Sequence, residues 1–158
     1  EINLDEEIES LETYLELEAI RFEDSFHYSV KIEEDVPEEI HIPSLLIQPY
    51  VENAIKHGLL HQKGDKNLKI EIKLSPDEKA IQVIIEDNGI GRIKSTKLQQ
   101  GRSKKHVSFA SSATQKRLDI LNEQRKNKIV VEYTDKQENG VSCGTIVKIE
   151  IPFTKLEE

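Results

Sequence analysis

Residues 47–58 combine side chains that can hold a metal ion and an anion together. Glu52, Asn53, Lys56 and His57 supply a carboxylate, a carboxamide, an ammonium group and an imidazole within two helical turns. A solvated helix face usually carries interchangeable Lys, Glu and Gln, so this mixture indicates a candidate binding site. The apolar residues of the stretch recur at the spacing of one helix face, which places the polar side chains opposite. These apolar residues are Ile47, Tyr50, Val51, Ala54 and Gly58.

A second candidate segment runs from Asp87 through Asn88, Gly89 and Ile90 to Gly91, directly after a strand-like run. Glycine permits positive φ and lets a ligand approach the main chain closely. Asp87 can accept a hydrogen bond from an amino-substituted heterocycle such as adenine. Taken alone, the segment is better explained as an ordinary strand-ending turn, but its pairing with the first segment favours a binding site.

Helical patterns surround these two segments. Residues 4–22 keep helical spacing among many glutamates and predict an acidic amphipathic helix. We expect it to cover an edge of the domain; the alternative is that residues 1–24 continue from an upstream helical bundle. In the helix that contains the first segment, Ser44 is the expected N-cap, and Pro49 is expected to bend or loosen the first turn. Residues 113–126 predict a further helix.

Strand patterns define the expected sheet. Residues 26–32 alternate apolar and polar side chains and predict a strand with one buried face. Residues 68–74 with 81–86, and residues 129–133 with 145–151, form two predicted hairpins. Because short turns join these strands, they must be antiparallel. The sequence therefore predicts an α/β two-layer sandwich, with a mixed, mostly antiparallel sheet and helices on one face.

Composition restricts the class of protein. The 158 residues suffice for one domain with a core and are too few for two comfortable ones. A formal net charge of -8 argues against nucleic acid as the partner, because a phosphate-binding face needs an excess of Lys and Arg. Cys143 is the only cysteine, which excludes an intramolecular disulfide and favours a reducing compartment. No apolar run approaches the roughly 20 residues of a spanning helix, so we expect no membrane contact by these residues. The lack of an initial Met indicates a piece of a longer protein.

The two segments and their order resemble a known family. Residues 52–58, residues 87–91, a Lys- and Ser-rich loop and Gly144-Thr145 look like the N box, first G box, ATP lid and closing Gly-Thr segment of Bergerat-type (GHKL) ATPases. The longer run of residues 48–58 is similar to the LytS-like sensor histidine kinases. The resemblance covers nearly the whole chain. It implies the Bergerat fold for a single domain, residues 1–158, with residues 92–110 as the ATP lid.

The resemblance also implies a role for each matching residue. Asn53 is expected to coordinate Mg²⁺ that bridges the phosphates of ATP, because Mg²⁺ favours oxygen ligands together with phosphate and water. Asp87 is expected to bind the adenine amino group, with Thr145 assisting through a water molecule. Gly89 and Gly91 are expected to shape the pocket floor. Lys56 and His57 are expected to approach the phosphates, and the lid residues Arg102, Lys104, Lys105 and His106 are weaker candidates for phosphate contact.

Two positions depart from the family pattern. In chaperone-type members the carboxylate that activates water lies one helical turn before the metal-binding Asn, where this chain has Pro49. Glu52 is adjacent to Asn53 and rotated by about 100° around the helix. It is a candidate catalytic residue that orients a phosphoacceptor or a water, and a capping or salt-bridge role is the equal alternative. Ala110 replaces a glycine at the end of the lid, which predicts weaker nucleotide binding or an altered lid geometry.

These residues favour the ATP-binding catalytic domain of a two-component sensor histidine kinase, which transfers the γ-phosphoryl group of Mg-ATP to a histidine. None of the five histidines stands in the context of an acceptor, so the acceptor is expected on upstream dimerisation helices of the same protein. The other expected partners are a response regulator and a second copy in a full-length homodimer. We expect a cytoplasmic domain of a membrane-anchored protein. The alternatives are a hydrolytic Bergerat ATPase, which Pro49 disfavours, and a non-catalytic nucleotide-binding or interaction module, which Ala110 supports.

Overall fold

The computed structural model describes the backbone of residues 1–92 and 107–153, and the side chains of residues 1–92 and 112–153. A five-stranded sheet has the order β2-β4-β5-β7-β6. Its only parallel pair within this described sheet is β2 with β4, and the remaining pairs are antiparallel. The strands are β2 (Phe26–Ile32), β4 (Lys66–Leu74), β5 (Ala80–Asp87), β6 (Val130–Glu138) and β7 (Val141–Pro152).

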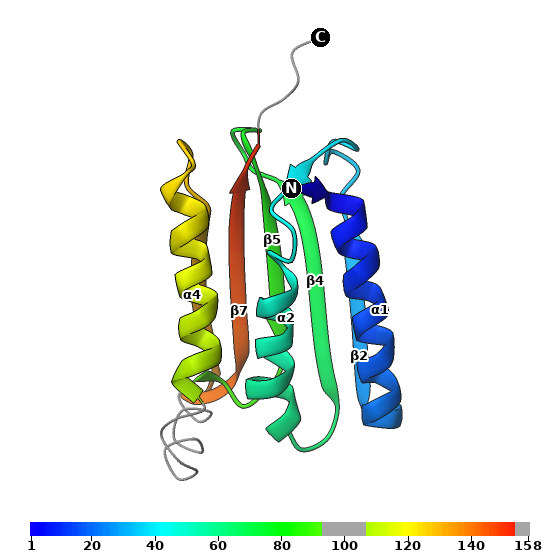
Figure 1. Ribbon diagram of the computed structural model, residues 1–158. Coiled ribbons are helices and arrows are strands. Elements are labelled where there is room, and N and C mark those ends of the chain that lie inside the picture. Colours follow the sequence, from blue (N-terminus) through cyan, green and yellow to red (C-terminus); the bar gives the residue numbers. More distant parts are fainter. Residues whose placement is uncertain (93–106, 154–158) are drawn as a thin grey trace.

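The helices α1 (Leu4–Phe22), α2 (Gln48–Asn53) and α4 (Val107–Glu123) lie on one face of this sheet (Figure 1). α1 lies over β2, α2 lies over the centre of the sheet, and α4 lies toward β7. The predicted two-layer α/β architecture, with a mixed and mostly antiparallel sheet, is therefore confirmed. The described residues also form short elements: β1 (Ile2–Asn3), η1 (Glu23–Ser25), β3 (His41–Ile42), the π turn η2 (Ala54–Gly58) and η3 (Leu59–His61).

The core lies between the sheet and the helices because strand side chains alternate between the two faces. On β5, Ile81, Val83 and Ile85 are fully buried, whereas Gln82 and Glu86 are half-buried. All apolar residues that the sequence placed on one face of residues 47–58 are buried, so that prediction is also confirmed. This packing fixes the polar side of α2 away from the core.

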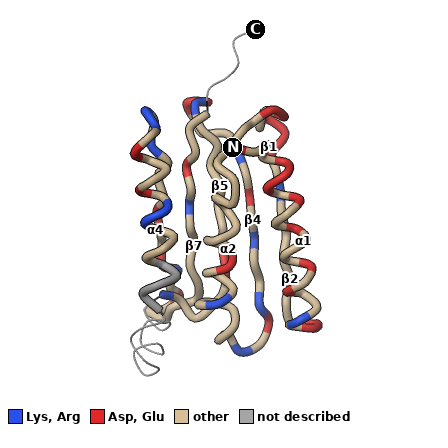
Figure 2. Tube along the Cα trace, in the orientation of Figure 1, with Lys and Arg blue, Asp and Glu red and all other residues tan. Residues whose placement is uncertain are grey.

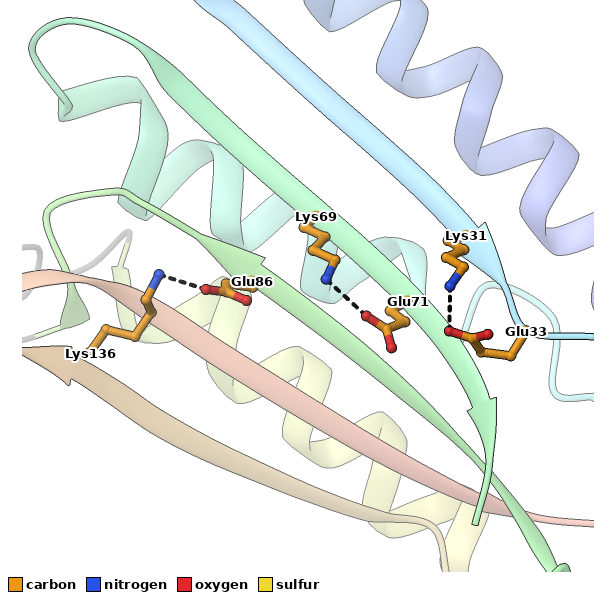
Figure 3. A network of polar contacts seen from close by, with 6 residues as sticks. All are labelled: Lys31, Glu33, Lys69, Glu71, Glu86 and Lys136. Atoms are coloured by element: carbon orange, nitrogen blue, oxygen red, sulfur yellow. Dashed lines mark hydrogen bonds and ion pairs between the residues drawn. The ribbon is translucent and has the colours of Figure 1, made fainter.

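The other face of the sheet carries charges of both signs. Lys and Arg are interspersed with Asp and Glu along the strands, whereas α1 is mainly acidic (Figure 2). Several of these charges pair with one another, so this face is a solvated surface with balanced charge. The pairs in Figure 3 are Lys136 with Glu86 (2.7 Å), Lys69 with Glu71 (3.0 Å) and Lys31 with Glu33 (2.7 Å).

The beginning of α2 differs from the sequence prediction. The helix begins at Gln48, and Ser44 is not its N-cap. Leu45 has a φ of 53°, and this left-handed conformation keeps the preceding residues out of the helix. Pro49 lies in the first turn, where its missing N–H breaks no helical hydrogen bond. The irregularity of this segment falls later, at the π turn of Ala54–Gly58.

Candidate functional site

The two candidate segments meet at the end of the π turn. The Ile90 amide donates a hydrogen bond to the Gly58 carbonyl oxygen at 3.3 Å. A Cβ atom at Gly89 would lie 2.4 Å from the Gly58 carbonyl carbon, so the backbones touch and only glycine fits there. A Cβ atom at Gly58 would lie 3.0 Å from Oδ1 of Asp87. The helical segment and the turn after β5 therefore form one contiguous structure.

Asp87, the last residue of β5, is a buried carboxylate with 3% of its surface exposed. Its Oδ1 accepts a hydrogen bond from the Gly89 amide at 2.8 Å. Burial raises the pKa of Asp87 to about 6, although the backbone amides of Gly89 and Thr145 and the charge of Lys136 lower it. At neutral pH the group is thus an ionised acceptor in a desolvated position, which strongly favours a ligand with a hydrogen-bond donor.

β7 supplies the neighbouring wall. Thr145 is the strand partner of Asp87 and is buried, with 7% of its surface exposed. Gly144 has a φ of 137°, and a Cβ atom there would lie 1.9 Å from the Asp87 carbonyl oxygen. Gly91 has a φ of 82° and packs on Ser142, whose Oγ lies 1.9 Å from the position of a Cβ atom. The glycines thus let three chain segments approach closely around Asp87 and Thr145.

The polar residues of α2 and the π turn lie next to this junction along the chain. Asn53 is the last residue of α2 and is half-buried, and its side chain makes no hydrogen bond to another residue of the described ranges. Glu52 accepts a hydrogen bond from Nε2 of Gln48 at 3.0 Å. Lys56 is exposed, and burial together with the neighbouring Lys56 lowers the pKa of half-buried His57. His57 is therefore neutral at pH 7.

The side chains of this site can bind a metal ion only if another molecule supplies further ligands. Within residues 1–92 and 112–153, no three His, Cys, Asp or Glu side chains are arranged to hold a metal ion. Asn53 offers one carboxamide oxygen, a neutral oxygen donor, and Mg²⁺ takes most of its remaining ligands from substrate phosphates and water. The residues of this chain thus fit Mg²⁺ that arrives with a nucleotide.

The structure brings together Gly58, Asp87, Gly89, Gly91 and Thr145 by direct contact or strand pairing. Asn53, Lys56 and His57 belong to the helical segment that ends in this contact. Four predicted phosphate-binding residues lie outside the described residues, and so does most of the predicted lid, residues 92–110. These four are Arg102, Lys104, Lys105 and His106. The side chain of Ala110 is likewise outside the described side chains.

Three further residues support the site, and sequence reasoning missed them. Asn88 Oδ1 accepts the Asn67 amide at 2.7 Å, and Asn88 Nδ2 donates to the Asp65 carbonyl oxygen at 3.0 Å, which ties the turn to the start of β4. Arg92 donates two hydrogen bonds to the Asp135 carboxylate, both of 2.9 Å. These partners are distant in sequence, so no local pattern reveals them.

The third residue is Glu7, and its position in the sequence already indicates a buried carboxylate. It lies on the apolar stripe of α1, and its carboxylate accepts the backbone amides of Leu45 and Ile47. A charged residue on the buried stripe of an amphipathic helix needs a partner. The sequence alone does not show which partner that is.

None of the described helices is long and apolar enough to cross a membrane.

Comparison with known proteins gives one consistent relationship. No family model matches the chain. It is 28% identical over 157 residues to the sensor histidine kinase/phosphatase LytS of Staphylococcus aureus strain Mu50, a match that covers 99% of this chain and 26% of LytS. The chain therefore spans about a quarter of the length of the curated relatives that it matches.

Solved structures agree with the sequence relationship. The mycobacterial sensor histidine kinase MprB matches with a TM-score of 0.62 and 14% identity, over 96% of each chain. The histidine kinase ThkA, in complex with the response regulator protein TrrA, matches with a TM-score of 0.63 and 13% identity, over 97% of this chain and 41% of the other. In sequence the chain is thus similar to the sensor histidine kinase/phosphatase LytS, and in fold it is similar to these two histidine kinases.

Proposed function

We propose that this chain binds Mg-ATP and transfers its γ-phosphoryl group to a histidine that lies outside residues 1–158. The carboxylate of Asp87 accepts a hydrogen bond from the adenine amino group, and Thr145 assists through a water molecule. The carboxamide of Asn53 holds Mg²⁺, and Gly89 and Gly91 shape the floor of the pocket. The residues proposed to approach the phosphates are Lys56, His57 and Lys105.

The observation that carries this proposal is the contact between Gly58 and the turn that contains Asp87. A buried ionised acceptor at that contact suits a base with an amino donor. The helical segment that ends at Gly58 carries Asn53 five positions earlier, so this contact joins the segment that carries Asn53 to the strand end that carries Asp87. Base recognition and phosphate binding can then occur on two neighbouring segments. The relationship to LytS and to histidine kinase folds supports the same function.

Phosphoryl transfer of this kind depends on positioning and on charge neutralisation. Mg²⁺, when bound with the phosphates, supplies part of that neutralisation. Glu52 is the proposed catalytic residue that orients the acceptor histidine, and the hydrogen bond from Gln48 holds its carboxylate in place. Lys56 adds a positive charge one helical turn further along, and neutral His57 can donate or accept one hydrogen bond.

Calorimetric titration of the chain with Mg-ADP tests nucleotide binding. We expect saturable binding that Asp87→Ala abolishes at millimolar nucleotide. Asp5→Ala is the matched control, because it removes an exposed carboxylate in the first turn of α1 and should leave the affinity unchanged. The proposal fails if the wild-type chain does not bind, or if Asp87→Ala binds equally well.

Phosphotransfer requires a second experiment with an acceptor. A longer version of the protein that includes the upstream helices, incubated with γ-labelled ATP, should acquire an acid-labile and base-stable phosphohistidine. We expect the label to pass onward to a response regulator. Nucleotide binding without any label on a histidine would instead favour the non-catalytic module.

The setting of the domain follows from the same proposal. The acceptor histidine belongs to dimerisation helices of the longer protein, which acts as a homodimer. The catalytic domain faces the cytoplasm, where ATP and the response regulator are found, while another part of the protein anchors it to the membrane.

A further inference from the structure

A buried carboxylate joins the first helix to the segment before α2. Glu7 has 1% of its surface exposed and lies in the first turn of α1. Its Oε2 accepts the Leu45 amide at 2.7 Å, and its Oε1 accepts the Ile47 amide at 3.0 Å. Hydrogen bonds from amides to an ionised carboxylate are among the stronger ones in proteins. The contact therefore connects two parts of the chain that are about 40 residues apart.

Besides Glu7, the segment before α2 is held by the buried side chains of Leu46 and Ile47 and by Arg117, which donates a hydrogen bond to the Ser44 carbonyl oxygen. Leu45 is a half-exposed residue in the left-handed region, which is unfavourable for a branched side chain. Ile47 precedes the helix and provides no side-chain cap. Pro49, in the first turn, has no N–H to donate. The Glu7 carboxylate thus supplies from α1 the hydrogen-bond acceptors that the segment itself lacks.

The N-terminal segment contacts the same stretch at two more points. The Leu4 amide donates to the Ile40 carbonyl oxygen at 2.8 Å, and Ile2 of β1 pairs with Ile42 of β3. Together with Glu7, these contacts make the start of α1 and the approach to α2 one structural unit. Of these three contacts, the one made by Glu7 reaches the residue immediately before α2.

We propose that Glu7 is a positioning residue for Asn53: by holding the backbone of Leu45 and Ile47, it sets the axis of α2. This inference rests on the proposed role of Asn53 in binding Mg-nucleotide. Asn53 lies six residues after Ile47, which is about 9 Å along a helix. A small change in the direction of the axis at Ile47 therefore displaces the Asn53 carboxamide, while Asp87 on β5 keeps its place. The effect should appear in metal-dependent binding and not in recognition of the base.

The first test uses amide hydrogen exchange in the chain without nucleotide. Glu7→Gln preserves size but replaces one accepting oxygen by an NH₂ group, which faces an amide donor. We expect faster exchange at residues 45–53 and unchanged exchange in the β4–β5 hairpin. Glu6→Gln is the matched control, because Glu6 lies in the same turn with the same charge but is exposed. Wild-type exchange at residues 45–53 in Glu7→Gln would overturn the proposal.

The second test separates positioning from general stability. The affinity for ADP is measured with Mg²⁺ and with a chelator, and the ratio of the two affinities is compared between variants. We expect Glu7→Gln to lower this ratio by about tenfold, in line with the loss of a residue that orients a metal ligand. The affinity for ADP without Mg²⁺ should stay within about twofold of wild type, because the ligand environment of Asp87 is retained. Glu6→Gln should leave both values unchanged.

The outcomes distinguish the two proposals. A wild-type chain that binds no nucleotide refutes the proposed function, whereas normal wild-type binding with an unchanged ratio in Glu7→Gln refutes only the positioning role. If Glu7→Gln does not fold, Glu7→Asp decides the question, since it keeps the carboxylate on a shorter side chain. A ratio between those of wild type and an Asn53→Ala variant supports the proposal, and a wild-type ratio overturns it.

Discussion

Replacing Asp87 by asparagine should change the stability of the folded chain in a way that depends on pH. Relative to wild type, the variant should be more stable at neutral pH than at acidic pH. The pKa of Asp87 rises from 3.8 to about 6 on folding, chiefly because the carboxylate is buried. Between these values the folded chain binds this proton and the unfolded chain releases it. Stability therefore falls as the pH rises through that window. With about 1.36 kcal/mol for each pKa unit, the ionised carboxylate costs about 3 kcal/mol above pH 6.

The assay is urea unfolding of wild type and Asp87→Asn at pH 4 and at pH 7. The amide replaces a carboxylate that accepts the Gly89 amide, and this exchange has its own cost at both pH values. The difference between the two pH values removes that constant cost. We expect the free energy of unfolding of the variant, relative to wild type, to be about 2 to 3 kcal/mol higher at pH 7 than at pH 4.

Asp5→Asn is the control for this measurement, since its carboxylate is exposed and therefore lacks the burial that the comparison tests. An Asp87→Asn variant whose relative stability is the same at both pH values would refute the reasoning. It would mean that burial does not perturb this carboxylate, and the argument for a desolvated acceptor would fail with it.

Three further predictions concern Gly89, Glu52 and Asp135. Gly89→Ala should lower the free energy of unfolding by about 1 to 3 kcal/mol, because the new methyl group meets the Gly58 backbone, and it should also weaken Mg-ADP binding. Denaturant titration measures the first effect and calorimetry the second. Unchanged values would contradict the close contact. Glu52→Gln should slow phosphotransfer by about 10² to 10⁴ with Mg-ADP affinity retained, as measured with labelled ATP; wild-type rates would leave Glu52 a structural role. Asp135→Asn should cost at most about 1 kcal/mol, because its ion pair with Arg92 is partly exposed; a much larger loss in urea unfolding would show that this pair is essential to the fold.

Local patterns predicted the fold well because its elements have clear periodicity. The alternation along β5 and the helical spacing of residues 47–58 both follow directly from which side chains meet the core. The prediction for the start of α2 was wrong because Leu45 adopts a left-handed conformation that a distant carboxylate supports. β6 extends to Glu138, past the apolar residues that predicted it, because pairing with β7 continues through polar residues.

The candidate site was partly predictable for the same reason. Glycines and polar residues at Asn53, Asp87 and Thr145 stand out by type and order, and the structure places Asp87 and Thr145 side by side. The supporting contacts of Glu7, Asn88 and Arg92 join residues far apart in the chain. No spacing rule reports such contacts, so they required the three-dimensional structure.

The sheet topology has a consequence for the order of folding. The β4–β5 hairpin closes a short loop, since Leu74 pairs with Ile81. β2 has only β4 as a partner in this sheet, and Tyr28 pairs in parallel with Leu68, 40 positions away. Contacts that close long loops form late, after local hairpins. The β4–β5 and β6–β7 hairpins should therefore form first, whereas the pairings of β2 with β4 and of β5 with β7, and the hydrogen bonds from Leu45 and Ile47 to Glu7, close later.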